Sequence, residues 1–184
     1  MGSKGTVRER LIDTAAELFY EKGYNSTGIN EIIEKAQVAK ASMYSHFRTK
    51  EELCVAYLKH KESDFLIGLK SFIDALPEGK NKIMGIFDFL LEFYHSTGFR
   101  GCWCINTMSE IPRDNQVIRQ EIIRQKSVLK DYIIQLLKAN TQVENSTSTS
   151  NQLYLIYEGA VAESYLHQDE WPILEAKEIA KQLV

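Results

Sequence analysis

The chain has 184 residues, of which 44% are apolar, and it carries a formal net charge of −3. This length corresponds to one or two domains with a hydrophobic core of ordinary size. The negative balance argues against a protein that binds nucleic acid through its overall charge, and no apolar run reaches the ~18 residues that span a membrane.

The charge is unevenly distributed along the chain. Residues 1–50 carry eight Lys and Arg against six Asp and Glu, whereas residues 51–184 carry fourteen against nineteen. A weakly basic N-terminal part on an acidic body is compatible with a selective DNA-binding protein. No charged and then apolar leader precedes the first predicted helix, and the three cysteines form no disulfide framework, so we expect a cytoplasmic protein.

The first predicted helix runs from about Thr6 to Lys22. Its apolar residues recur at helical spacing, at Val7, Leu11, Ala15, Leu18 and Phe19. Gly23 supplies the stop, because glycine commonly follows the last turn of a helix. We interpret the apolar stripe as the core of a small three-helix domain.

A helix, a tight turn and a second short helix are predicted between Thr27 and Phe47. Thr27 is placed to cap the first helix. The buried face of that helix is formed by Ile29, Ile32, Ile33 and Ala36. Gln37–Ala39 breaks the spacing, and Met43 and Phe47 anchor one side of the second helix, Lys40–Phe47. This layout is a helix-turn-helix, whose second helix enters the major groove of DNA.

A dense motif covers the same region. It reads Glu21-Lys22-Gly23-Tyr24, then Thr27, then Ala36-x-Val38-x-Lys40-x-Ser42-x-Tyr44-x-His46-Phe47-x-x-Lys50-Glu51-x-Leu53. The motif resembles the DNA-binding domain of TetR-type transcriptional regulators, over roughly the first sixty residues. Beyond them, the resemblance rests on the helical pattern alone.

Two positions depart from the family pattern. Gln37 stands where the family usually has a glycine, and Ala39 stands where it usually has a capping serine. Gln37 must therefore adopt a conformation that glycine takes more cheaply. The second helix also lacks a side-chain cap, which is often worth ~1 kcal/mol.

The rest of the chain reads as a series of helices. Thr49 caps a long helix that Pro77 ends, and Glu52 completes its capping box. Further helices are predicted from Ile83 to Tyr94, from about Gly101 to Pro112, from Asn115 as cap to about Ala139, from about 151 to 168, and from Trp171-Pro172 onward. Residues 140–150 are rich in Ser, Thr and Asn and are predicted to form a polar loop.

No stretch alternates as a strand does, so the predicted fold is all-α. We expect an N-terminal three-helix DNA-binding head in residues 1–50, with its helix-turn-helix at about 28–47. Residues 51–184 would form a helical effector-binding and dimerisation domain. In the family, one long helix joins these parts, so the resemblance implies that a shift in the body moves the recognition helix.

Candidate DNA contacts fall into two groups. The candidates for phosphate oxygens are Thr27, Lys40, Tyr44, His46 and Lys50. The candidates for base edges are Gln37, Ser42, Met43 and Ser45, with Ala39 and Ala41 short enough to touch a thymine methyl group. For Tyr44, packing inside the head is an equally good interpretation, and the sequence leaves both open.

One head makes few contacts, so we expect a homodimer on a palindromic operator in double-stranded DNA. The segments at about 116–139 and 151–168 are the predicted dimer surface, and in the family they form a four-helix bundle across the two-fold axis. Packing within one chain is the alternative for both segments.

An effector pocket is predicted in the body, for an aromatic or amphipathic small molecule. Ligand sites are mainly apolar walls with a few placed polar groups. The predicted lining is Phe87, Tyr94, Cys102, Trp103, Asn106, Tyr154, Tyr157 and Glu158. Each aromatic residue is also a candidate for the ordinary core.

The pair Cys102-Trp103-Cys104 has three interpretations. A metal site is disfavoured, because a tetrahedral site needs about four ligands and no other close cysteine or paired histidine exists. A thiol that senses electrophiles or oxidants requires a lowered pKa, which a helix start and the nearby Arg100 could provide. Buried thiols without any chemistry are the third interpretation. We expect no metal and no cofactor.

Catalytic motifs are missing from the sequence: the four histidines are scattered, and no nucleophile triad or phosphate-binding glycine loop is present. We therefore expect a regulator, most simply a repressor that a small effector releases from its operator. Ligand would favour a state whose recognition helices no longer match successive major grooves, about 34–36 Å apart. The alternatives are a thiol-based sensor on the same scaffold and a helical protein-interaction adaptor.

Overall fold

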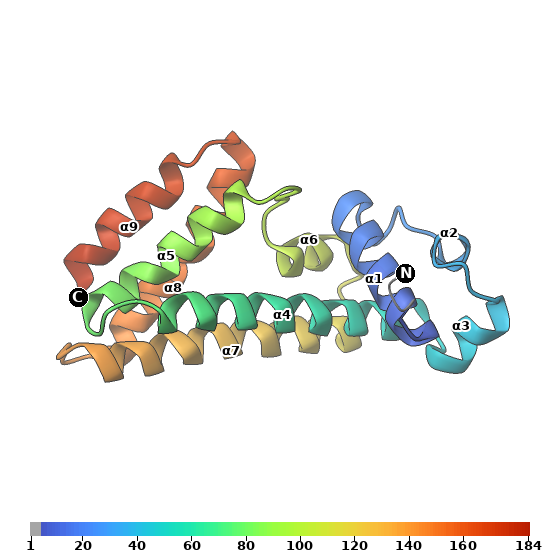
Figure 1. Cartoon of the computed structure of the whole chain (residues 1–184), viewed down its shortest axis with the longest axis horizontal. Coiled ribbons are helices and arrows are strands. Elements are labelled where there is room, and N and C mark those ends of the chain that lie inside the picture. The colour runs from blue at the N-terminus through green and yellow to red at the C-terminus, as the bar shows by residue number, and fades with distance from the viewer. Residues whose placement is uncertain (1–4) are drawn as a thin grey trace. The chain divides into compact units, whose positions relative to one another are not determined.

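The computed structural model describes residues 5–184. Within that range the chain forms nine helices and no strand, which confirms the all-α prediction (Figure 1). The helices are α1 (Val7–Lys22), α2 (Ile29–Lys35), α3 (Lys40–His46), α4 (Lys50–Asp74), α5 (Lys80–His95), α6 (Trp103–Glu110), α7 (Gln116–Asn140), α8 (Ser146–His167) and α9 (Trp171–Leu183). No helix in this described part of the chain is long and apolar enough to cross a membrane.

The helices form two compact units. The first contains the chain up to Asp64 and the segment Trp103–Arg124, and the second contains Phe65–Cys102 and Gln125–Val184. The division falls inside α4 and α7, so each of these helices contributes to both units. Residues 5–50 of the predicted DNA-binding segment lie in the first unit, and residues 1–4 lie outside the described part. The functional boundary at residue 50 stays a prediction.

The start of α1 is fixed by its own sequence. The Thr6 hydroxyl accepts a hydrogen bond from the Glu9 N–H at 3.2 Å, and the Glu9 carboxylate accepts one from the Thr6 N–H at 2.7 Å. This reciprocal pair is a capping box, and the backbone hydrogen bond lowers the pKa of Glu9. Gly23, at φ +92°, follows the last residue of α1, as predicted.

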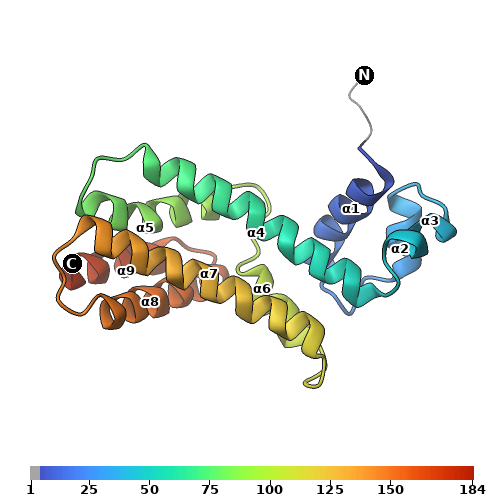
Figure 2. The ribbon, with the colours of Figure 1, turned by 90° about the horizontal axis from the view of Figure 1, so that it is seen from below.

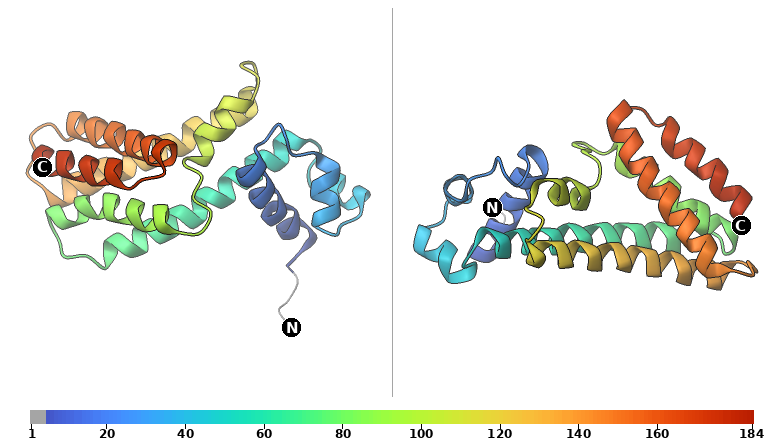
Figure 3. Two further views of the ribbon diagram at one scale, coloured as in Figure 1. Left: turned by 90° about the horizontal axis from the view of Figure 1, so that it is seen from above. Right: turned by 180° about the vertical axis from the view of Figure 1, so that it is seen from behind.

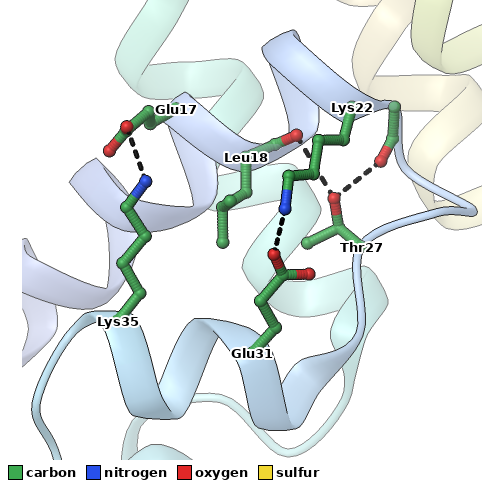
Figure 4. Close-up of polar contacts among 7 residues, drawn as sticks. Glu17, Leu18, Lys22, Thr27, Glu31 and Lys35 are labelled. Atoms are coloured by element: carbon green, nitrogen blue, oxygen red, sulfur yellow. Dashed lines mark hydrogen bonds and ion pairs between the residues drawn. The ribbon is translucent and has the colours of Figure 1, made fainter.

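Two ion pairs join α1 to α2 in the first unit (Figure 4). Lys22 pairs with Glu31, and the Lys35 Nζ lies 2.6 Å from a carboxylate oxygen of Glu17. All four side chains are more than one-third exposed, so the pairs contribute little to stability. The packing of α2 on α1 therefore depends mainly on other contacts.

Thr27 makes a more important link between the same helices. Its side chain is fully buried, and its hydroxyl donates to the carbonyl oxygens of Gly23 at 2.8 Å and Leu18 at 3.2 Å (Figure 4). The prediction that Thr27 caps α2 is wrong, because its hydroxyl is used for these α1 carbonyls. The N-cap of α2 is Gly28, which makes no side-chain hydrogen bond.

The core of the second unit is built from parts of five helices. α8 packs against α9, and α5 contacts both (Figure 2, Figure 3). Its fully or nearly fully buried residues include Leu69 and Ile73 of α4, Ile83, Phe87 and Leu90 of α5, Leu129, Ile133 and Leu137 of α7, Leu153 and Tyr157 of α8, and Ile173 and Ala180 of α9. The apolar stripes predicted for these helices therefore face one another.

The predicted polar loop at 140–150 is wrong over its second half, because α8 begins at Ser146. Asn145 caps the helix, since its side-chain oxygen accepts the N–H of Ser148 at 3.0 Å. Ser150 is buried, and its hydroxyl donates to the Lys130 carbonyl on α7 at 3.4 Å. The polar composition predicted a loop, but these residues form the first turns of α8, where the Ser150 hydroxyl bonds to a carbonyl of α7.

Three other predicted helix starts are confirmed. The Thr49 hydroxyl accepts the N–H of Glu52 at 3.2 Å, and the Asn115 side chain accepts the N–H of Ile118 at the same distance. The capping box predicted at Thr49 is wrong, because the Glu52 carboxylate accepts the N–H of Arg48, at 2.7 Å, in place of that of Thr49. Pro172 lies in the first turn of α9, where its missing N–H has no partner to lose.

Candidate functional site

The turn between α2 and α3 depends on a left-handed glutamine. Gln37 has φ +54°, its N–H donates to the Glu34 carbonyl at 3.0 Å, and the Val38 N–H donates to the Ile33 carbonyl at 3.2 Å. These two hydrogen bonds form a Schellman motif, which usually has glycine at the left-handed position. The prediction that Gln37 adopts a glycine-like conformation is confirmed.

Replacing Gln37 with glycine is expected to raise the free energy of unfolding by about 0.5–1 kcal/mol. A left-handed conformation costs a non-glycine residue roughly 1–2 kcal/mol, of which the greater freedom of glycine in the unfolded chain cancels part. Urea denaturation measures the change, and Gln168→Gly, at φ +52° after α8, is the matched control with the same expected sign. A loss of stability in Gln37→Gly would mean that the glutamine side chain itself holds the turn.

α3 presents one buried side and one exposed side. Met43 and Phe47 are buried in the first unit, as predicted, while the residues between and before them face outward. The exposed residues are Gln37, Ala39, Lys40, Ala41, Tyr44, Ser45 and His46, and Ser42 is half-buried. Tyr44 is 44% exposed, so it is not enclosed by the packing of the unit. As expected, Ala39 at the N-cap of α3 offers no side-chain hydrogen bond.

Three of the predicted DNA contacts are less accessible. Thr27 and Met43 are fully buried, where they support the position of α3. Lys50 is half-buried, and its Nζ lies 4.2 Å from the centre of the Tyr24 ring, a cation–π contact. Burial lowers the pKa of Lys50. The surface that remains is the outer side of α3 with its preceding turn.

The end of α6 is tied to the turn after α1, also within the first unit. The Asn25 N–H donates to the Glu110 carboxylate at 2.6 Å, and the Asn25 side-chain amide donates to the Glu110 carbonyl at 2.7 Å. A Cβ at Gly23 would collide with the same carboxylate, so glycine there permits the approach. Sequence analysis missed this link, because the partners are 85 residues apart and neither lies in a recognisable motif.

The predicted effector-pocket residues do not all lie in one unit. Phe87, Tyr94, Cys102, Tyr154, Tyr157 and Glu158 belong to the second unit, while Trp103 and Asn106 lie on α6 in the first. Phe87 and Tyr157 are buried core residues whose ring centres are 6.3 Å apart. Burial raises the pKa of Tyr157.

The three cysteines differ in surroundings. Cys102 is half-buried, and its Sγ lies 3.1 Å from Lys126 Nζ, which in turn lies 2.6 and 2.7 Å from the two carboxylate oxygens of Glu158. Cys104 and Cys54 are buried, and burial raises the pKa of the Cys54 thiol to about 12. In the described part of the chain, no three His, Cys, Asp or Glu side chains gather into a possible metal site.

The helix-turn-helix geometry agrees with comparisons to known proteins. Residues 11–57 match the family described as bacterial regulatory proteins, tetR family. The IcaR protein of Staphylococcus epidermidis, a negative transcriptional regulator of the biofilm operon icaADBC, is 30% identical over 132 residues, which cover 70% of this chain and 68% of IcaR. The chain belongs to the TetR family of bacterial regulatory proteins.

Two further proteins extend the comparison. The transcriptional activator FasR of Mycolicibacterium smegmatis is 27% identical over 95 residues, and the chain spans only 43% of its length. A TetR-family regulator from Streptomyces coelicolor, SCO4454, has the same fold: its crystal structure gives a TM-score of 0.86 at 24% identity and covers 96% of this chain and 93% of that one.

Membership settles the class of activity. TetR-family proteins are transcriptional regulators that bind DNA and typically act as dimers with small-molecule effectors. The predictions of a DNA-binding regulator and of a protein that is not an enzyme are therefore confirmed.

Proposed function

We propose that this protein is a dimeric, effector-responsive repressor that binds a palindromic operator through the outer side of α3. The observation that carries the proposal is the two-sided α3: Met43 and Phe47 fix it in the unit, and the opposite side offers Lys40 and Tyr44 to a partner. A helix that is anchored on one side and polar on the other suits the major groove.

The exposed residues divide by the chemistry that each offers. Lys40, the Tyr44 hydroxyl and His46 are suited to phosphate oxygens, with Lys50 as a half-buried fourth, and such contacts set the register of the protein on DNA. Gln37, Ser42 and Ser45 offer hydrogen bonds to base edges, and the methyl groups of Ala39 and Ala41 suit thymine.

The surface proposed for the dimer is centred on α8. Leu155 and Leu166 are 66% and 70% exposed on this helix, and between them lie Gly159 and Ala162, also exposed. The spacing of four, three and four residues puts all of them on one helix face, and the two small residues permit another helix to approach closely. α9 has exposed large apolar residues of its own, Trp171, Leu174 and Ile179.

The other predicted dimer segment, 116–139, has fewer large apolar residues on its surface. Leu129, Ile133 and Leu137 are used in the core of the second unit, which leaves Val117 and Ile123 as its large exposed apolar residues in the described structure. We therefore assign this segment a secondary part in the interface.

Release of the repressor from DNA by an effector follows from thermodynamic linkage between the two binding sites. An effector that binds better to a dimer whose α3 helices no longer match successive major grooves must weaken DNA binding, and DNA must weaken effector binding by the same factor. The Asn25–Glu110 hydrogen bonds are a contact through which α6 can act on the DNA-binding helices of the first unit. Such a regulator would work in the cytoplasm.

Sequencing of the genomic DNA fragments that the purified protein retains tests the proposal. A short palindrome shared by the fragments, found near a small number of genes, is the expected result. Retention without any common sequence, or no retention at moderate salt, would favour the adaptor alternative.

A thiol-sensing regulator is the second candidate, because Lys126 Nζ lies 3.1 Å from Cys102 Sγ. An adjacent ammonium favours the thiolate. The sulfur would add to the β-carbon of an α,β-unsaturated carbonyl, and the thiol proton would end on the α-carbon, so no oxidant or leaving group is needed.

Selective alkylation distinguishes this candidate. Iodoacetamide is expected to modify Cys102 at least about tenfold faster than Cys54, whose buried thiol has a raised pKa. The extent of modification at each cysteine is measured by mass spectrometry, and Lys126→Met should slow the reaction of Cys102. Alkylated protein that keeps full operator affinity would exclude a sensing role.

A further inference from the structure

A hollow of about 460 Å³ opens in the second unit between the end of α5 and the last turn of α8. It is lined by Tyr94, Ser96, Gly98, Phe99, Arg100, Ser164, Tyr165 and Gln168. Its volume is within the range of small-molecule sites, roughly 300–1,000 Å³. Only Tyr94 is shared with the predicted effector pocket, so this is a different site.

One wall of the hollow is aromatic. The ring centres of Tyr94 and Phe99 are 5.2 Å apart, those of Phe99 and Tyr165 are 6.3 Å apart, and both pairs meet edge to face. A Cβ at Gly101 would lie 3.2 Å from Tyr165, so glycine allows the 96–101 loop to lie against α8. Tyr165 is 43% exposed, so its ring is open to an aromatic ligand.

The guanidinium of Arg100 makes the hollow favourable for an anion. Among the described residues that line it, Arg100 is the one with a charged side chain. A guanidinium has five N–H donors in a planar fork, so Arg100 can bind a carboxylate with two of them and keep contacts to the protein with others. The Ser96 and Ser164 hydroxyls already donate to the carbonyls of Phe93 and Val161, at 2.6 and 3.3 Å, so the attraction for an anion rests on Arg100.

We infer that this hollow binds an aromatic carboxylate, with the ring against Phe99 and Tyr165 and the carboxylate on Arg100. The inference rests on the proposed effector-responsive function and names the chemical class of the effector. Tyr165 and Gln168 line the hollow, and Leu166 between them belongs to the proposed dimer face of α8. A ligand in the hollow would therefore act on the helix turn that also contributes to the dimer.

Calorimetric titration of the full-length protein with 2-naphthoate tests the site. We expect Arg100→Gln to weaken binding at least about tenfold, because a charged hydrogen-bonded pair is lost. Arg113→Gln, an exposed arginine of the first unit, is the matched control and should leave binding unchanged. The neutral 2-naphthalenemethanol should bind weakly to the unaltered protein and equally weakly to Arg100→Gln.

A second variant separates loss of the aromatic wall from loss of the charge. Tyr165→Ala removes an exposed ring and should weaken both compounds, whereas Arg100→Gln weakens only the carboxylate. Equal affinity for the two compounds, an unchanged affinity in Arg100→Gln, or tighter binding of decanoate than of 2-naphthoate would overturn the inference. Operator binding is measured separately: a protein that binds its palindrome but not 2-naphthoate refutes the inference alone, and one that binds 2-naphthoate but no DNA refutes the proposed function alone.

Discussion

Replacing Gly159 with tryptophan is expected to convert the protein into a monomer and to lower its operator affinity by about 100-fold or more. Two linked DNA-binding heads gain affinity because binding of the second head is an intramolecular event, and a monomer loses this gain. Gly159 lies at the centre of the exposed α8 face, between Leu155 and Ala162. An indole there would prevent the close approach of a partner helix.

The same change should leave each chain folded. A Cβ at Gly159 meets no other atom within 4 Å, and tryptophan is a better helix former than glycine by about 0.3–0.5 kcal/mol. Sedimentation equilibrium gives the mass, and thermal unfolding reports the fold. Gly159→Ala is the control: it should remain dimeric and gain up to about 1 kcal/mol of stability. A dimeric Gly159→Trp with full operator affinity would place the interface elsewhere.

Lys40→Ala is expected to weaken binding to every DNA sequence by about tenfold or more. An ammonium on a phosphate contributes through the release of counterions, at a slope of about 0.9 per phosphate in log K against log salt. A dimer loses two such contacts, so its slope should fall by about 1.8. Fluorescence anisotropy with operator and scrambled duplexes at several salt concentrations measures both quantities.

Two further variants make the Lys40 result specific. Lys138→Ala removes an exposed charge from the last turn of α7 in the second unit and should leave both affinity and slope unchanged. Ser42→Ala should mainly alter discrimination between operator bases, by about 1–3 kcal/mol at one position. If Lys40→Ala and Ser42→Ala both left DNA binding intact, α3 would not be the recognition helix.

The sequence by itself determined the local structure of this protein. The all-α fold, the caps at Thr49 and Asn115 and the glycine-like conformation of Gln37 all follow from residues within a few positions of one another. Helix caps and apolar periodicity act over one or two turns, so they are readable in a single sequence. The DNA-binding motif was recognisable for the same reason, because its residues are contiguous.

The tertiary structure alone decided where side chains went when the partner was distant in the chain. Thr27 was well placed to cap α2, but its hydroxyl bonds to carbonyls of α1. Ser150 lies in a segment of loop-like composition, but a neighbouring helix gives its hydroxyl a partner. The same holds for the contacts of Glu110 with Asn25 and of Cys102 with Lys126, whose partners are far apart in the sequence. The hollow beside Arg100 is likewise lined by two segments that lie together only in the folded chain. A buried polar group takes whichever partner the fold supplies, and spacing along the chain does not encode that choice.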